Sequence, residues 1–124
     1  MKYLRRFNEN LEFIPDVIKN LEQMLYSIKD VGFKTKVDFL DENFLVVDIS
    51  MDSTEFVVFN SIDIRETLED INRYLTLDEK FNLIDVELTT VPFSIKKMKI
   101  DRLLKTSILL VRCKLTWGVS PVMT

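Results

Sequence analysis

The stretch SILLVRCKLTW, Ser107–Trp117, alternates apolar with other side chains along most of its length. A two-residue period places successive side chains on opposite faces of a β-strand. The pattern predicts a strand with one face formed by Leu109, Val111, Cys113, Leu115 and Trp117. The opposite face is expected to carry Leu110, Arg112, Lys114 and Thr116. One apolar and one charged face are typical of an antiparallel sheet with one solvated side.

Upstream of this strand, the sequence changes between helical and strand periods. Apolar residues three and four positions apart predict helices over about 14–31 and 63–76. Alternating or short apolar runs bounded by turn residues predict strands over about 33–39, 44–50, 55–60 and 81–91. The predicted order of elements is therefore α-β-β-β-α-β-β.

Residues that start or stop regular structure agree with these ranges. Pro15 suits the first turn of a helix and Gly32 its C-terminal end. Asp63 and Glu66 have the spacing of a capping box at the start of the second helix. Pro92 is expected to end the fourth strand or to mark a sheet edge.

The element order predicts an α+β fold. Short connections between the first three strands favour an antiparallel meander. Two helices with one apolar stripe each are expected to pack on one face of a mostly antiparallel sheet. The 124 residues, 47% hydrophobic and 30% charged, predict a single domain spanning 1–124.

The composition argues against several kinds of chemistry. The chain has no histidine and one cysteine, which disfavours His-dependent nucleophiles and zinc or iron–sulfur centres. Two glycines cannot form a Gly-rich phosphate-binding loop. We therefore expect no cofactor, no bound metal and no small-molecule substrate.

The sequence predicts a cytosolic protein with no membrane partner. No apolar run approaches the about 20 residues that span a bilayer. The N-terminal MKYLRRFNEN lacks the apolar core of a signal peptide. A single cysteine agrees with a reducing compartment.

Charge is distributed unevenly along the chain. Residues 38–91 hold three basic and fourteen acidic groups, whereas residues 92–124 hold seven basic groups and one acid. SIKKMKIDRLLK, Ser94–Lys105, gathers five of the seventeen cations, namely Lys96, Lys97, Lys99, Arg102 and Lys105. These five are candidate interaction residues.

Three interpretations of this basic segment remain open. Its cations can pair across the sheet with Asp85, Glu87 or their neighbours, which is the usual behaviour of surface charge. They can also meet an acidic surface on a second copy or on another protein. Nucleic acid is the least favoured partner, because the pI is about 5.0 and no aromatic residue lies between Phe93 and Trp117.

The last ten residues, Leu115–Thr124, carry no charge. This segment either completes the core or acts as a docking tail, with Trp117, Val122 and Met123 as candidate contact residues. A tryptophan is a common interface anchor, but a core position is the competing interpretation.

Three groups of residues are candidates for enzyme chemistry. The element order overlaps that of restriction-endonuclease-like nucleases, with Asp48 in the expected place, but Glu55 is followed by Val57 where a lysine is needed. The tripeptide Asp78–Lys80 has the lysine but lies in a predicted loop. Asp85 and Glu87 share a strand face and could bind a cation, although exposed carboxylates are the commoner outcome. Cys113 is expected to be a buried, inert thiol.

The opening MKYLRRFNEN, together with VGFKTKVDF and DIRETLEDINRYL, resembles small uncharacterised proteins of tailed bacteriophages. The element order resembles that of phage tail-terminator and tail-completion proteins, which form rings at a tail end. This resemblance implies a virion subunit or a small protein that disables a host factor.

Together these features predict a non-enzymatic interaction or structural subunit of a larger assembly, as a homo-oligomer or with a protein partner. A phage-encoded inhibitor of a host protein is the first alternative, and a metal-dependent nuclease is the second.

Overall fold

The computed structural model describes residues 2–41, 43–51, 57–90 and 94–119, with side chains from Pro15 onward. Its elements are α1 (Lys2–Lys29), β1 (Phe33–Asp41), β2 (Phe44–Met51), β3 (Phe59–Asn60), the 3-10 helix η1 (Ser61–Ile64), α2 (Arg65–Arg73), the π-helix η2 (Tyr74–Asp78), β4 (Phe81–Thr90), β5 (Ser94–Lys97), α3 (Ile100–Lys105) and β6 (Leu109–Val119).

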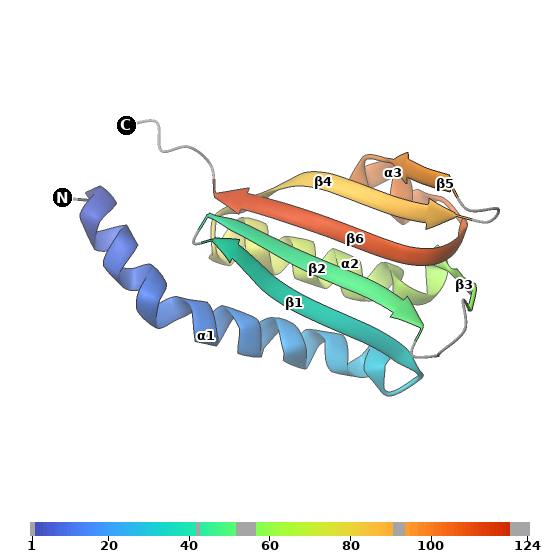
Figure 1. Cartoon of the computed structure of the whole chain (residues 1–124), viewed down its shortest axis with the longest axis horizontal. Helices are drawn as coiled ribbons and strands as arrows, with labels where there is room; N and C mark the ends of the chain where they lie inside the picture. The colour runs from blue at the N-terminus through green and yellow to red at the C-terminus, as the bar shows by residue number, and fades with distance from the viewer. Residues whose placement is uncertain (1, 42, 52–56, 91–93, 120–124) are drawn as a thin grey trace.

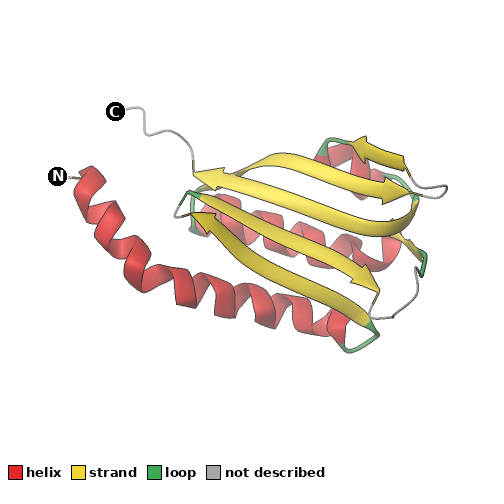
Figure 2. Ribbon diagram, in the orientation of Figure 1, coloured by secondary structure: helices red, strands yellow, loops and turns green. Residues whose placement is uncertain are grey.

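Within the described residues, the strands form one antiparallel sheet in the order β1-β2-β6-β4-β5, with β3 paired to β6. Figures 1 and 2 show the helices behind this sheet, on one of its faces. The structure thus confirms the predicted α+β class. It also places the last strand of the chain, β6, in the middle of the sheet.

The core lies between the sheet and the apolar stripes of α1 and α2. Val17, Leu21, Leu25 and Ile28 of α1 are buried, as the helical period predicts. Leu68 and Ile71 of α2 and Leu75 of η2 complete the helical side. Each fully buried aliphatic side chain of this size contributes about 1.5–3 kcal/mol. The facing strand residues are Leu45, Val47, Ile49, Phe81, Val86, Leu88, Leu110, Cys113, Leu115 and Trp117.

The prediction for the first helix is wrong at its start. α1 begins at Lys2, and Pro15 lies inside it instead of in its first turn. Proline removes one backbone hydrogen bond and bends a helix without always ending it. Figure 1 shows that α1 is bent and that its N-terminal part extends beyond the sheet. The predicted C-terminal stop is confirmed, since Gly32 has the left-handed φ of +106°.

The predicted three-strand meander is also wrong. β1 and β2 pair as expected, but β3 comprises Phe59–Asn60 and pairs with Leu110 and Leu109 of β6. Residues 55–56 of the predicted strand lie outside the described residues. The short β3 leads directly into η1, so the chain leaves the sheet early.

The capping box lies one turn earlier than predicted. Asn60 caps η1, with its side-chain oxygen accepting the N–H of Ile62 at 2.9 Å. Asp63 accepts the N–H of Asn60 at 3.4 Å. Glu66 therefore has no capping partner at Asp63, because the helical turn already begins at Ser61.

The C-terminal part of the chain contains two elements that were not predicted. The basic segment forms β5 and α3, so the order of described elements gains a strand and a helix before β6. The register between β4 and β6 shifts beside Val111, which reverses the predicted faces at the start of β6. Leu109 is 56% exposed and Leu110 is fully buried. The predicted alternation holds from Cys113 to Trp117.

Candidate interaction surfaces

A row of alternating charges crosses the face of the sheet opposite the helices. The strand registers align Lys36 of β1, Asp48 of β2, Lys114 of β6, Glu87 of β4 and Lys97 of β5. Directly opposite residues on neighbouring strands have Cβ atoms about 5 Å apart, so opposite charges at such positions attract each other. The chain therefore neutralises much of its own charge on this face.

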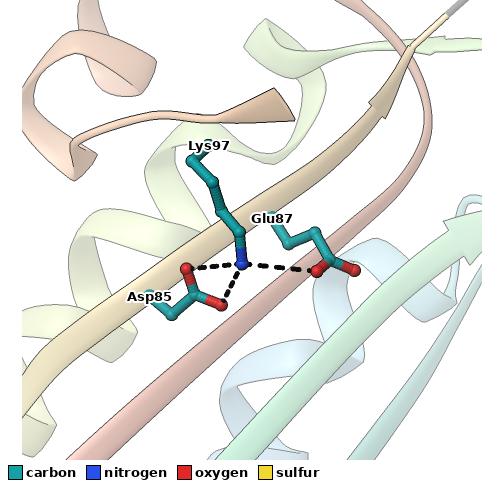
Figure 3. Close-up of polar contacts among 3 residues, drawn as sticks. All are labelled: Asp85, Glu87 and Lys97. Atoms are coloured by element: carbon teal, nitrogen blue, oxygen red, sulfur yellow. Dashed lines mark hydrogen bonds and ion pairs between the residues drawn. The ribbon is translucent and has the colours of Figure 1, made fainter. Parts of the chain in front are cut away.

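Lys97 is the best-connected cation of this row. Figure 3 shows its ammonium between Asp85 and Glu87. Lys97 Nζ donates to Asp85 Oδ1 and Oδ2 at 2.9 and 2.8 Å, and to Glu87 Oε1 at 3.4 Å. The hydrogen bond to Asp85 is the main reason why the pKa of Lys97 is raised. The predicted pairing of the basic segment with Asp85 and Glu87 is thus confirmed for Lys97.

Arg112 forms the second strong pair of this face. Its guanidinium donates through Nε and Nη2 to the two carboxylate oxygens of Asp48, with Nε at 2.8 Å from Oδ1. This bond raises the pKa of Arg112. Such two-pronged pairs are geometrically specific and stronger than single contacts. Arg112 therefore holds Asp48 in a fixed orientation on the sheet.

The residues of the nuclease hypothesis are not brought together as a metal site in the described chain. Asp48 is held by Arg112, and Glu55 lies outside the described residues. Val57 occupies the position where the nuclease motif needs a lysine. Asp78 ends η2, and Lys80 has a φ of +63° just before β4. Among the described residues, no group of three or more metal-binding side chains gathers.

Four cations of the basic segment have no ion pair with another described residue. Lys96 lies opposite Leu88, whose side chain is buried on the helical side, so Lys96 points to that side as well. The other three belong to α3 and its N-terminal cap and are exposed. We call this set the basic patch: Lys96, Lys99, Arg102 and Lys105.

An acidic surface lies on the exposed side of η1 and α2. Asp63, Glu66, Glu69 and Asp70 are all exposed, and we call them the acidic stripe. Their spacing of three and four residues places them on one helical face. Asp70 pairs with Arg73 at 3.4 Å, and the other three make no ion pair with described residues. In sequence, the stripe is visible as the excess of acids between residues 38 and 91.

The docking-tail hypothesis is wrong for its first half. Residues 115–119 belong to β6, and Trp117 is fully buried because it faces α2 across the core. Its indole N–H donates to Asn72 Oδ1 at 3.1 Å. Val122 and Met123 lie outside the described residues.

The structure also contains a shallow cavity and a buried cysteine. A shallow cavity of about 460 Å³ lies beside β4 and is lined by residues 83–86 and 97–101. Burial raises the pKa of the Cys113 thiol to about 12, in agreement with the expected inert cysteine. In the described part of the chain, no helix is long and apolar enough to cross a membrane.

Comparison of the chain with protein-family models, with curated proteins and with solved structures found no match. The chemistry of the exposed surfaces therefore carries the functional assignment.

Proposed function

We propose that this chain is a non-enzymatic interaction subunit of a larger protein assembly and that it docks through the basic patch. The observation that carries the proposal is the contrast between two sets of cations. Lys97 and Arg112 are bound by carboxylates of their own chain, whereas the four cations of the patch face solvent. Unpaired, clustered charge attracts and orients a complementary surface.

An acidic protein surface fits the patch better than nucleic acid does. Asp101 lies exposed between Lys99 and Arg102, and the acidic stripe adds further carboxylates on the helical side. Carboxylates close to the cations repel a continuous phosphate backbone. A protein surface can offer acids and bases in a matching pattern.

The phage resemblance of MKYLRRFNEN gives the proposal a setting. It favours a subunit of a virion, or of its assembly in the host cytoplasm. The small size of the chain and its segregated charge suit a subunit that must bind in one orientation.

Capture of partners from cells that naturally make the protein tests the proposal. A tagged chain is cross-linked in those cells beside a variant with Lys96, Lys99, Arg102 and Lys105 changed to Gln. A matched control carries Lys19→Gln, Lys29→Gln, Lys34→Gln and Lys80→Gln, which removes the same charge from exposed positions elsewhere. We expect the wild type and the control to be cross-linked into a complex and the patch variant to be lost from it. Equal capture of all three, or capture of none, would contradict the proposal.

The acidic stripe favours a second candidate function, inhibition of a basic host protein. Asp63 of η1 and Glu66 and Glu69 of α2 are exposed carboxylates that make no ion pair with described residues. If the chain is such an inhibitor, it binds its host target as a monomer. A stripe variant with Asp63→Asn, Glu66→Gln and Glu69→Gln would then no longer bind the target, whereas the patch variant would still bind it. The opposite loss pattern would contradict the inhibitor hypothesis.

A further inference from the structure

We infer that the partner of the basic patch is a second copy of this chain, whose acidic stripe receives the patch while its own patch docks in return. This inference rests on the proposed function and names its partner. It predicts a symmetric dimer that buries the exposed sides of α2 and α3 in both subunits.

The two surfaces lie side by side on one side of the molecule. Figure 1 shows α2 and α3 behind the sheet, in the same layer. The end of α3 is joined to η1 by hydrogen bonds: Ser61 Oγ donates to the Thr106 carbonyl at 2.8 Å, and Ile108 N donates to Ser61 Oγ at 3.0 Å. Asn60 and Ser107 add a further bond at 2.8 Å. These bonds hold the patch and the stripe at a fixed separation.

Neighbouring surfaces of opposite sign are self-complementary about a two-fold axis. An axis that passes between them places each patch over the stripe of the other subunit and uses every contact twice. Four cations then face four carboxylates in each half of the interface. Among the described residues, no ion pair joins the two surfaces, and of their eight charged residues only Asp70 has an ion pair, with Arg73.

An exposed isoleucine lies in η1, the element that contacts both α2 and α3. This residue, Ile62, is 48% exposed. A two-fold axis near η1 brings the two copies of Ile62 close to each other. An apolar centre surrounded by a charged rim is the usual anatomy of a protein interface.

Paired charge reversals test the inference directly. One variant carries Lys99→Glu and Arg102→Glu, and the other carries Glu66→Lys and Glu69→Lys. In a dimer of either variant alone, the two reversed side chains would face like charges in both contacts, so we expect each variant to be monomeric. A mixed dimer has one natural contact and one in which the reversed residues of the two variants face each other with opposite charge, so we expect an equimolar mixture to restore the dimer. Mass is measured by light scattering during size-exclusion chromatography.

Salt and the apolar centre provide independent readouts. For the wild type, raising NaCl from about 0.05 to 0.5 M is expected to weaken the dimer about tenfold or more, since salt screens exposed charge. Ile62→Asp is also expected to weaken it, whereas the control pair Lys19→Glu and Lys29→Glu is not. Circular dichroism confirms that each variant is folded.

The outcomes separate this inference from the proposed function. A wild-type chain that stays monomeric at low salt, or a mixture that does not dimerise, overturns the second-copy inference. If the monomeric wild type is cross-linked to another protein and neutralising the patch abolishes that cross-link, the proposed function holds and the partner is a different acidic protein. If short duplex DNA binds the monomer through the patch, both are overturned in favour of nucleic acid.

Discussion

Lys96 and Lys97 are neighbours in sequence but lie in opposite electrostatic environments. The strand period turns Lys97 toward Asp85 and Glu87 on the face of the sheet opposite the helices, and turns Lys96 to the helical side. One side chain therefore neutralises the sheet, and the other adds charge to the basic patch. The register of β5 on β4 therefore decides which of the two adjacent lysines is available to a partner protein.

Cys113 shows how burial controls reactivity at a single residue. Its side chain is fully buried, and loss of hydration raises the pKa of the thiol to about 12 from 9.0. At pH 8 the thiolate fraction is then about 1,000-fold below that of an unperturbed thiol. We expect reaction with a disulfide reagent to be slow in the native protein and fast in guanidinium chloride. Equal rates in the two conditions, followed by absorbance, would contradict this account.

Tyr74 makes the stability of the fold sensitive to alkaline pH. Its hydroxyl accepts from Asn20 Nδ2 at 2.9 Å and donates to Glu79 Oε2 at 2.8 Å. Burial, as the largest cause, raises the pKa of Tyr74 from 10.0 to about 12. The folded state thus retains a proton that the unfolded state releases above pH 10.

The contribution of Tyr74 to stability is therefore full below pH 10 and is lost as the pH rises to about 12. We expect the difference in unfolding free energy between wild type and Tyr74→Phe to shrink across this window. Urea unfolding at several pH values measures it, and subtraction of the Phe variant removes the parallel effect of Cys113. A difference that is constant with pH would rule out this role for the Tyr74 hydroxyl.

At the scale of the elements, local periodicity predicts the helices and strands that are long enough to show a repeated pattern of apolar residues. The stripe of α2 and the alternation of β4 are of this kind, and both elements lie where they were predicted. β5 has four residues, all exposed, and α3 has six, so neither is long enough to show a period. Both were missed for that reason.

The candidate site was predicted only in part. Counting charges identifies the basic segment and the acidic middle, but it cannot separate paired from free cations. That separation depends on the β4–β5 and β2–β6 registers, which are long-range contacts. The sequence leaves a core position and a docking role open for Trp117, because an uncharged C-terminal segment has the same composition in a core strand and in a contact surface.

The charge row across the face of the sheet opposite the helices offers a test at this scale. Asp48 lies between Lys36 and Lys114 and also binds Arg112. Asp48→Lys places four cations together, and cross-strand pairs of this kind contribute about 0.2–1 kcal/mol each. We expect the variant to lose about 1–2 kcal/mol of unfolding free energy, and Asp48→Asn to lose less. Thermal or urea unfolding measures both losses.

Salt dependence distinguishes charge repulsion from a packing defect in Asp48→Lys. Screening by about 1 M NaCl should recover part of the lost stability if repulsion is the cause. A loss that salt does not change would show that the side chain acts through its shape and not through its charge.

For the whole molecule, chain order and sheet order differ in one decisive respect. β6 is the last described strand, yet it lies between the β1–β2 and β4–β5 pairs and also binds β3. Figure 1 shows that β6 separates the two pairs along its length. Without β6, the described sheet consists of two hairpins that share no backbone hydrogen bonds.

Cooperative folding should therefore require the last strand. A chain ending at Thr106 is expected to show no cooperative thermal transition, because Leu110, Cys113, Leu115 and Trp117 are missing from its core. A synthetic peptide of residues 107–124 should restore the transition by inserting as the central strand. Trp117 is the single tryptophan of the protein, so its fluorescence reports insertion of the peptide alone. We expect the emission to shift to shorter wavelength on mixing and to remain unchanged with a peptide carrying Leu115→Asp. A truncated chain that melts at the wild-type temperature would show instead that the two hairpins and the helices form a stable core without β6.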